Sequence, residues 1–277
     1  MLFVCPKCRE KLNICRSGSA KCPAGHSYDR SRDGYYNLLL SSKGGIHGDN
    51  AEMIAARAAF LSAGYYEPLA RALSELACEY VQDAAVLLDA GCGEGYYTEY
   101  VSQGFDNLLR EGKRKEPLDV YGFDISKSAA KRAAKRMRGA TVAVASSYNI
   151  PMSDGSAELL LNTFSPMATE EVARVLRAGG IFLMAIPAEE HLFELKREIY
   201  DTPYKNEPAD TNIPGFGLVA KKELRFTLRL DCAEAVRSLF AMTPYAYRTS
   251  SEGRARVCAL EHLDCTAHFI ILVYKKL

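Results

Sequence analysis

The chain has 277 residues, of which 48% are hydrophobic, so it can bury a full-sized core and disorder over its length is excluded. Its 35 basic and 34 acidic residues give a formal net charge of +1, which points to no particular class of partner. The charge is unevenly distributed, because residues 1–43 carry eight bases and three acids. This N-terminal stretch therefore has a charge of +5, and the remainder of the chain has −4.

The nine cysteines are an odd number, and several lie in apolar surroundings. No basic and then apolar signal segment precedes Cys5, so we expect a reducing, cytoplasmic environment. The longest apolar runs, 181–186 and 269–274, are far shorter than the ~20 residues that a membrane span requires. The sequence therefore predicts no membrane partner.

The first 40 residues are rich in Cys, Gly, Ser and charged residues and cannot form a core by hydrophobic burial alone. Cys5-Pro6-Lys7-Cys8 and Cys22-x-x-x-His26 form two ligand pairs thirteen residues apart, a spacing typical of two turns around one tetrahedral Zn²⁺. Because four protein ligands fill the coordination shell, the zinc is expected to be structural, with a binding energy on the order of 10 kcal/mol that replaces the missing core. The alternatives are free thiols that are close only in sequence, or Cys15 as a substitute ligand.

Residues 50–83 have apolar positions at helical spacing, interrupted near Gly64 and Pro68, and predict two connecting helices. From Ala84 onward, buried strands alternate with helices near Tyr96, Lys127 and Thr169, which predicts a parallel, doubly wound α/β sheet of the Rossmann-like kind. The expected strands are 85–89, 119–124, 141–145, 158–164 and 180–186, followed by a loop over 201–217, a strand over 224–230 and a last strand over 267–274 that closes the sheet edge.

A glycine-rich turn follows the first of these strands, in Asp89-Ala90-Gly91-Cys92-Gly93-Glu94-Gly95-Tyr96. The three glycines allow close approach of a ligand at the carboxyl end of the strand, where doubly wound folds bind nucleotides. Asp124 ends the second strand, where its carboxylate can accept hydrogen bonds from both ribose hydroxyls. The alternative is a tight turn that serves only the fold.

The order of glycines and acid distinguishes two cofactors. The spacing is Gly-x-Gly-x-Gly, and Asp89 precedes the first glycine, whereas pyrophosphate-binding loops hold negative charge with glycines and a helix dipole. A carboxylate here suits a ligand that carries an amine and a sulfonium. The pattern therefore favours S-adenosylmethionine over NAD.

Further motifs run along the chain from Cys5 onward, and together they resemble the bacterial 23S rRNA (guanine-N1-)-methyltransferases. They comprise Cys5-Pro6-x-Cys8, Cys22-Pro23-x-Gly25-His26, Gly34-Tyr35-x-Asn37-Leu38-Leu39, Gly48-Asp49-x-x-Glu52-Met53, Arg57-x-x-Phe60-Leu61-x-x-Gly64-x-Tyr66-x-Pro68-Leu69, Gly91-Cys92-Gly93-Glu94-Gly95-Tyr96-Tyr97, Ala145-Ser146-Ser147 and His191-Leu192-x-Glu194-Leu195-Lys196.

The resemblance implies a zinc-binding RNA-recognition module over 1–40, a helical connector over 41–83 and a class I methyltransferase domain over 84–277. It further implies a homodimer that methylates N1 of a guanine in a hairpin loop of 23S rRNA. By the same resemblance, Cys5, Cys8, Cys22 and His26 hold the zinc, and the cofactor is bound by Tyr66, Asp89, Gly91, Gly93, Glu94, Gly95, Tyr96, Asp124 and His191. Alternatively, His191 is a buried structural histidine.

The target side of the site is less well defined by the sequence. The guanine N1 proton must be lost, and the Ser165 hydroxyl or the main-chain carbonyls before Pro166 are the acceptors we consider, although Pro166 alternatively only ends a strand. A base extruded from a hairpin requires an aromatic surface, for which Tyr35, Tyr36 or Phe164 could serve. Tyr35 and Tyr36 are alternatively core residues of a small ribbon. The basic residues of the next helix could contact phosphates or form a solvated surface; they are Lys127, Lys131, Arg132, Lys135, Arg136 and Arg138.

Two other functions are alternatives to methylation of 23S rRNA. One is a methyltransferase for another RNA or a small molecule, against which the basic N-terminal stretch argues. The other is a non-catalytic RNA-binding protein that retains the fold. The intact Gly91, Gly93, Gly95 and Asp124 argue against that second alternative.

Overall fold

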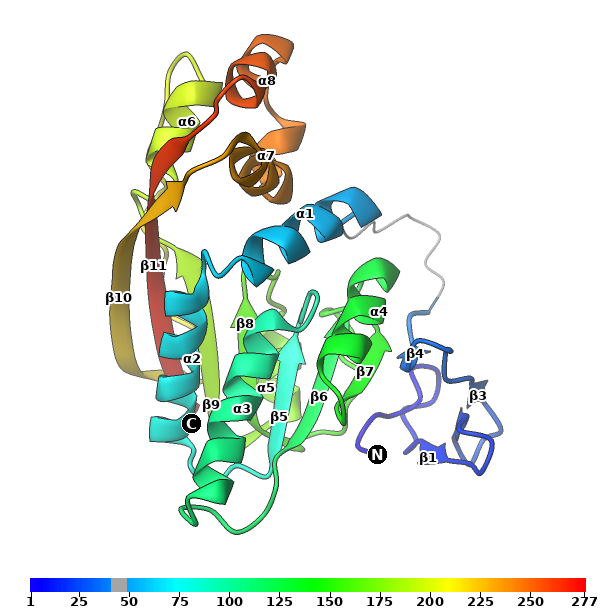
Figure 1. Cartoon of the computed structure of the whole chain (residues 1–277). Coiled ribbons are helices and arrows are strands. Elements are labelled where there is room, and N and C mark those ends of the chain that lie inside the picture. The colour runs from blue at the N-terminus through cyan, green and yellow to red at the C-terminus, as the bar shows by residue number, and fades with distance from the viewer. Residues whose placement is uncertain (41–48) are drawn as a thin grey trace.

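The computed structural model describes residues 1–40 and 49–277, and consists of one large sheet with helices on both faces and a small ribbon at one side (Figure 1). Lys43, Gly48 and the rest of 41–48, where the predicted connector begins, lie outside the described residues. No helix of the described part is long and apolar enough to cross a membrane.

The N-terminal ribbon contains a three-stranded antiparallel sheet of β1 (Asn13–Ile14), β2 (Ala20–Lys21) and β3 (Ser27–Tyr28). Its last strand, β4 (Tyr35–Asn37), leaves this small sheet and pairs in parallel with β7 of the large sheet. The ribbon is therefore joined to the catalytic sheet by main-chain hydrogen bonds.

The large sheet has eight strands in the order β10-β11-β9-β8-β5-β6-β7-β4. The strands from β9 to β4 are parallel, whereas β11 is antiparallel to both of its neighbours, so the sheet is mixed. The bounds are β5 (Val86–Ala90), β6 (Asp119–Asp124), β7 (Thr141–Val144), β8 (Ala157–Thr163), β9 (Leu176–Pro187), β10 (Phe216–Leu230) and β11 (Leu263–Lys276).

The prediction that the last strand closes the sheet edge is wrong, because β11 lies between β9 and β10 and the edge strand is β10. β10 also begins at Phe216, inside the predicted loop 201–217. Both errors have the same cause. β10 and β11 form a long antiparallel pair, registered from Phe216–Lys276 to Leu230–Leu263, and a strand pairing of this kind is not visible in local sequence patterns.

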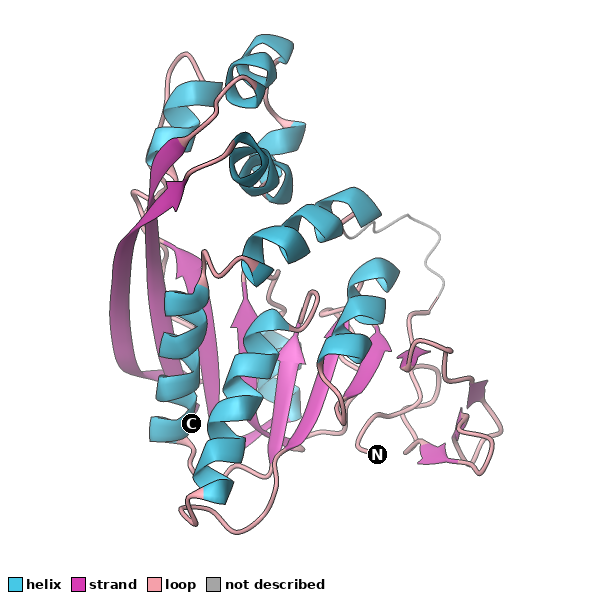
Figure 2. Cartoon of the chain, viewed as in Figure 1, coloured by secondary structure: helices cyan, strands magenta, loops and turns pink. Residues whose placement is uncertain are grey.

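Helices cover the sheet and its carboxyl edge (Figure 2). Helices α2, α3 and α4 lie on one face and α5 on the other, while α1 lies across the carboxyl ends of the parallel strands. The predicted helices are α1 (Ala51–Ser62), α2 (Glu67–Tyr80), α3 (Tyr96–Arg110), α4 (Lys127–Arg136) and α5 (Thr169–Val175).

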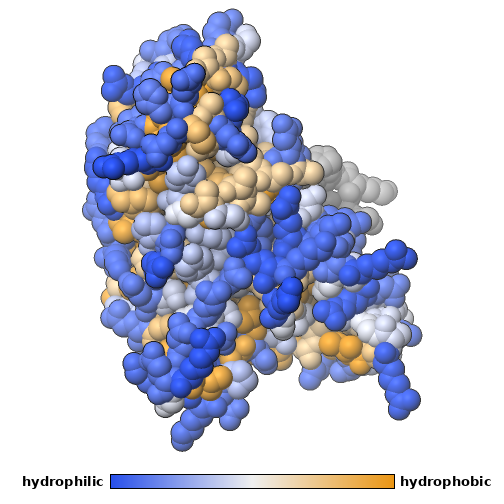
Figure 3. All heavy atoms as spheres, in the orientation of Figure 1, coloured by the Kyte–Doolittle hydropathy of each residue, from blue (hydrophilic) through white to orange (hydrophobic). Residues whose placement is uncertain are grey.

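A second group of helices lies beyond the carboxyl ends of β9 and β10 and was not predicted from the sequence. It consists of α6 (Phe193–Ile199), α7 (Ala233–Met242), the 3₁₀ helix η1 (Pro244–Tyr247) and α8 (Ser251–Cys258). α1 packs against α7, so these helices and α1 together cover the carboxyl edge of the sheet. We call α1, α6, α7, η1 and α8 the roof helices. In Figure 3 the exposed side of α1 forms a pale apolar band on an otherwise largely hydrophilic face.

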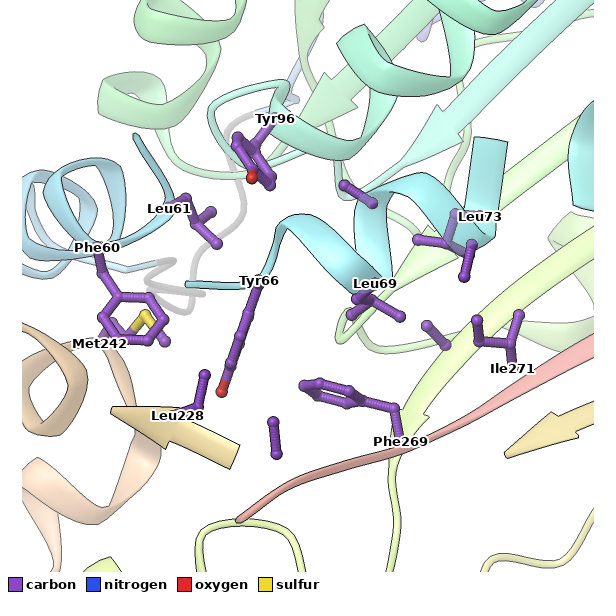
Figure 4. Close-up of a cluster of buried hydrophobic side chains, with 14 of the residues drawn as sticks. Phe60, Leu61, Tyr66, Leu69, Leu73, Tyr96, Leu228, Met242, Phe269 and Ile271 are labelled. Atoms are coloured by element: carbon purple, nitrogen blue, oxygen red, sulfur yellow. The ribbon is translucent and has the colours of Figure 1, made fainter. Parts of the chain in front are cut away.

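Each face of the sheet has its own core. On the face of α2 and α3, the cluster includes Phe60, Tyr66, Leu73 and Phe269 (Figure 4). On the opposite face, Phe3 of the ribbon packs with its ring 5.2 Å from that of Tyr121. No helix connects β7 to β8, and the ribbon covers the place that such a helix would occupy.

Candidate functional site

The ribbon brings together the four residues that its spacing predicted as metal ligands. The Sγ atoms of Cys5, Cys8 and Cys22 and a ring nitrogen of His26 all lie within 4.8 Å of one another. A tetrahedral Zn²⁺ with bonds of about 2.3 Å to sulfur separates its ligand atoms by roughly 3.8 Å, so three thiolates and an imidazole at this spacing fit zinc. Cys15 is not part of the cluster.

Tight turns position these ligands. The amide of Arg9 donates to the Cys5 carbonyl at 2.8 Å, and the amide of Gly25 donates to the Cys22 carbonyl at 3.0 Å. Arg9 and Gly25 have φ of +64° and +85°, so each turn is closed by a residue in the left-handed region. Each ligand pair is therefore positioned by a tight turn of its own.

The glycine-rich turn lies between β5 and α3, as predicted. Gly91, Gly93 and Gly95 all have positive φ, between +55° and +84°. A Cβ on Gly91 would lie 2.0 Å from Oγ of Ser165, and one on Gly95 would lie 2.8 Å from Met137, so packing also requires glycine at both positions. A Cβ on Gly93 would meet nothing within 4 Å, so space remains above the middle of the turn.

Buried polar atoms without hydrogen-bond partners concentrate around this turn. Among the described residues, the side-chain atoms of this kind are Asp89 Oδ1, Glu94 Oε2, Tyr96 Oη and Thr163 Oγ1. The first three belong to the turn, and the fourth ends the neighbouring strand β8. Because each buried unsatisfied group costs about 1–3 kcal/mol, their clustering indicates that a polar ligand binds here.

Asp89 is suited to a cationic partner. Its side chain is only 2% exposed, and the Thr98 hydroxyl donates to Oδ2 while Oδ1 is unpaired. Burial raises the pKa of Asp89 to about 7, with a smaller contribution from the charge of Asp124, against the lowering effect of Thr98. An ammonium group that donated to Oδ1 would satisfy the orphaned oxygen and restore the ionised form.

Asp124 ends β6 and faces the same turn. The amides of Gly93 and Ser126 donate to its two carboxylate oxygens at 2.9 and 2.7 Å. Burial raises the pKa of Asp124 despite these two hydrogen bonds. Each oxygen keeps a lone pair, so the carboxylate can still accept from vicinal hydroxyls, which are the groups that a ribose offers.

Tyr66 and His191, which are 125 positions apart, meet beneath the roof helices. The His268 amide donates to Nδ1 of His191 at 3.3 Å, so the proton of the neutral ring is on Nε2, which donates to Tyr66 Oη at 3.4 Å. Burial lowers the pKa of His191 to about 3, which keeps the imidazole neutral. In Figure 4, Tyr66 points down between Phe60 and Phe269.

Aromatic contacts connect this pair to the glycine-rich turn. Phe269 lies 5.0 Å from Tyr66, Phe164 lies 5.5 Å from Phe269, and Tyr97 lies 6.1 Å from Phe164, measured between ring centroids. Tyr66, His191 and the turn therefore border one region at the carboxyl edge of the sheet. Neither Tyr97 nor Phe269 was predicted as a site residue. Tyr97 entered only as part of a motif, and Phe269 lies in an apolar strand where it resembles an ordinary core residue.

The end of β8 is attached to the glycine-rich turn. Asn162 is buried and its amide donates to the Ala90 carbonyl at 3.1 Å. Ser165 packs on Gly91, Pro166 is exposed, and Phe164 between them and the strand has φ of +59°. Ser165 therefore lies against the glycine-rich turn, and the exposed Pro166 follows it.

The structure decides against RNA contact for some of the residues considered for it. Tyr35 and Tyr36 are buried core residues of β4, so neither presents a ring to a base. On α4, Lys131 and Lys135 pair with Asp33 of the ribbon at 3.1 and 3.0 Å. These two lysines hold the ribbon against the helix, which their spacing in the sequence could not reveal.

Arg136 of α4 also has an internal role. It pairs with Glu94 and Glu99, each at 3.0 Å, and its guanidinium lies 5.5 Å from the centre of the Tyr96 ring. Glu94 is almost fully buried, and burial raises its pKa although Arg136 opposes the shift. Arg136 therefore stabilises the glycine-rich turn instead of extending into solvent.

The fold and the site define an S-adenosylmethionine-dependent methyltransferase of class I that carries an N-terminal zinc ribbon. Two family models match the chain, "Methyltransferase domain" over residues 88–184 and "RlmA, N-terminal", a zinc ribbon, over residues 3–42. The 23S rRNA (guanine(748)-N(1))-methyltransferase of Streptomyces fradiae is 33% identical over 91% of this chain and 88% of its own length. The chain belongs to the family of 23S rRNA (guanine-N1-)-methyltransferases.

Two other relatives extend the likeness over nearly the whole chain. A protein of Micromonospora griseorubida, named provisionally as a 23S rRNA (guanine-N(1)-)-methyltransferase, is 32% identical over 98% of this chain and 96% of its own length. The Bacillus subtilis protein YxjB, named in the same provisional way, is 29% identical over 99% of this chain and 97% of its own. The ribbon, the sheet and the roof helices thus all lie within the shared region.

Proposed function

We propose that this protein transfers the methyl group of S-adenosylmethionine to N1 of a guanine in a hairpin loop of 23S rRNA. The observation that carries the proposal is the buried, unpaired Oδ1 of Asp89 beside a glycine turn with open space above Gly93. A carboxylate so placed fits the ammonium group of S-adenosylmethionine, and the family supplies the acceptor. The residues present therefore fit the cofactor that the fold implies.

S-adenosylmethionine supplies an electrophilic methyl group on a sulfonium, so the protein has mainly to align the guanine with it. We propose that Asp89 binds the amine of the cofactor and that Asp124 binds its ribose. The other residues that contact the cofactor are Tyr66, Gly91, Gly93, Glu94, Gly95, Tyr96 and His191. Neutral His191 keeps the Tyr66 hydroxyl in place and adds no charge near the sulfonium.

Guanine N1 has an in-plane lone pair for the methyl group only after its proton has left, so that proton must pass to water before the N–C bond forms. We propose that the Ser165 hydroxyl and the main-chain carbonyls before Pro166 accept the N1–H hydrogen bond and direct that proton to water. The position of Ser165 on Gly91 supports this, because it places the hydroxyl between the cofactor turn and the exposed loop.

The remaining parts of the proposal concern partners. We propose that residues 1–40 recognise RNA with their basic surface, that 41–83 connect them to the methyltransferase domain over 84–277, and that the protein acts in the cytoplasm as a homodimer. The net positive charge of the N-terminal stretch supports an RNA partner. Sedimentation of the purified chain tests the homodimer.

The test of the activity uses labelled S-adenosylmethionine and protein-free 23S rRNA from a strain that lacks the gene. Since methylation at N1 blocks base pairing, primer extension should stop at a single guanine in a hairpin loop. Incorporation into a different RNA, or none while the cofactor still binds, would overturn the proposed acceptor. Absence of cofactor binding would overturn the methyltransferase assignment itself.

A further inference from the structure

Phe164 occupies an unusual position at the carboxyl end of β8. Its side chain is 44% exposed, although its ring lies beside those of Phe269 and Tyr97. Its φ of +59° is in the left-handed region, which a bulky L-residue adopts only at an energetic cost and which glycine would adopt freely. Strain of this kind, retained with an exposed aromatic ring, points to a use for the ring.

The surroundings support one side of the ring and leave the rest accessible. The centroids of Phe269 and Tyr97 lie 5.5 and 6.1 Å from that of Phe164, at interplanar angles of 42° and 74°. Phe269 is fully buried, so it forms a fixed base beneath Phe164. The ring is therefore held in one orientation while part of its surface faces solvent.

The segment that carries the Phe164 ring is fixed relative to the glycine-rich turn between β5 and α3. On one side the buried Asn162 donates to the Ala90 carbonyl at 3.1 Å, and on the other Ser165 contacts Gly91. The Asn162 amide is thus engaged with the main chain. Phe164, between these two attachments, is placed beside the cofactor turn with little freedom to move.

The reaction requires a flat support for the base. Once N1 has lost its proton, the lone pair that it uses lies in the plane of the guanine ring, so the base must present its edge to the methyl group. Both faces of the base are then free for stacking, and an aromatic side chain can fix the plane without obstructing the edge. Tyr35 and Tyr36, the other aromatic residues considered for this purpose, are buried in β4.

We propose that Phe164 is the platform on which the extruded target guanine stacks, held outward by its left-handed backbone at the cost of local strain. The proposal rests on the proposed function, because it assigns a surface of the same site to the base. Stacking on an aromatic side chain is worth roughly ten- to a hundredfold in affinity per base. Phe164 should therefore affect the RNA and leave cofactor affinity unchanged.

The experiment measures steady-state methylation of 23S rRNA, S-adenosylmethionine affinity by calorimetry and Tm for a set of variants. Phe164→Ala and Phe164→Leu should each lower kcat/KM for RNA by about ten- to a hundredfold. Phe164→Tyr should retain most of the activity, since it keeps the ring. Leucine is the informative variant, because it keeps apolar packing on Phe269 but lacks a flat face.

Two further variants separate stacking from stability. Phe164→Gly relieves the positive φ, so its activity should fall as far as that of the alanine variant while its Tm stays at or above the alanine value. Leu218→Ala, at a residue of β10 that is 43% exposed, removes an equally exposed apolar side chain far from the site and should leave kcat/KM unchanged.

The outcomes discriminate between the two proposals. Equal kcat/KM for wild type and Phe164→Leu would overturn the stacking platform while leaving the methyltransferase function intact. A loss of S-adenosylmethionine affinity in Phe164→Leu would also overturn it, because the ring would then belong to the cofactor site. A wild-type chain that methylates no guanine N1 would overturn both.

Discussion

At the scale of single residues, the unpaired Oδ1 of Asp89 yields a pH-dependent prediction. Burial raises the pKa of Asp89 to about 7 in the free chain, so at pH 5 to 6 the carboxyl is protonated and must lose its proton to accept from an ammonium group. Affinity for S-adenosylmethionine should therefore fall as pH drops from 7 to 5, by up to about tenfold per pH unit. Calorimetric titration across this range measures it.

The same carboxyl also affects the stability of the free chain. Because the pKa of Asp89 is higher in the folded chain than in the unfolded chain, its ionisation lowers the free energy of unfolding. This loss is absent near pH 4, grows as pH rises and is complete above pH 7.

Asp89→Asn should abolish the pH dependence of cofactor affinity between pH 5 and 7. At pH 7.5 it should weaken binding by roughly ten- to a hundredfold, the value of a hydrogen bond between charged groups.

The matched control for this change is Asp119→Asn. Asp119 is exposed at the opposite end of β6, so this variant should bind S-adenosylmethionine with wild-type affinity and wild-type pH dependence. If wild-type affinity did not change between pH 5 and 7, Asp89 would not be the partner of the amine.

The sequence correctly predicted the positions of residues that belong to local patterns in the chain. Asp89, the three glycines and Asp124 lie at the ends of recognisable strands, and the zinc ligands come in two local pairs. Contacts between distant segments were not predicted, because they depend on how segments pack. They include the hydrogen bond from Asn162 to Ala90 and the pairing of Lys131 and Lys135 with Asp33.

At the scale of elements, the segment between β7 and β8 is held in place by arginines instead of forming a helix. Arg174 of α5 donates to the carbonyls of Ile150 and Met152, each at 2.8 Å, and pairs with Glu171 at 2.7 Å. Arg9 of the ribbon donates to the Ile150 carbonyl as well, at 3.1 Å. The segment 149–152 therefore joins α5 to the ribbon.

Arg174→Lys should accordingly destabilise the protein, because lysine keeps the charge but cannot replace the planar fork that reaches several acceptors. We expect a loss of about 1–3 kcal/mol in the free energy of unfolding, since buried carbonyls lose their donors. Arg177→Lys is the control: the Arg177 side chain is 50% exposed and pairs with Glu158, so a lysine that keeps the charge there should cost ~0–1 kcal/mol. Equal denaturation midpoints for the two variants would contradict the prediction.

At this scale the sequence was reliable where periodicity is local and strong, as in β5, β6, β8 and the helices α1 to α4. In the C-terminal third, the predicted strands 224–230 and 267–274 lie within β10 and β11, but the position of β11 between β9 and β10 and the helices α6 to α8 were not predicted. These helices are short, from seven to ten residues, and their positions are determined by packing on α1 and the sheet. Short helices of this kind carry too few turns for a clear periodic pattern.

At the scale of the whole molecule, the ribbon is part of the same folded unit as the methyltransferase sheet. β4 adds a strand beside β7, Phe3 packs on Tyr121, and the Val4 amide donates to the Pro151 carbonyl at 2.9 Å. The ribbon also covers the face of the sheet that lacks a helix between β7 and β8. Folding of the sheet should therefore depend on the zinc that orders the ribbon.

Removal of zinc with a chelator should lower the Tm of the entire protein in a single calorimetric transition, because loss of the ribbon exposes the core around Tyr121 and unpairs β7. Cys8→Ser should have the same effect without a chelator, whereas Cys258→Ser, at an exposed cysteine outside the cluster, should not. Because β7 and the glycine-rich turn belong to one sheet, affinity for S-adenosylmethionine should fall together with Tm. Two separate transitions, with the larger one and cofactor affinity unchanged by the chelator, would instead show that the ribbon is an independent module whose zinc serves RNA recognition alone.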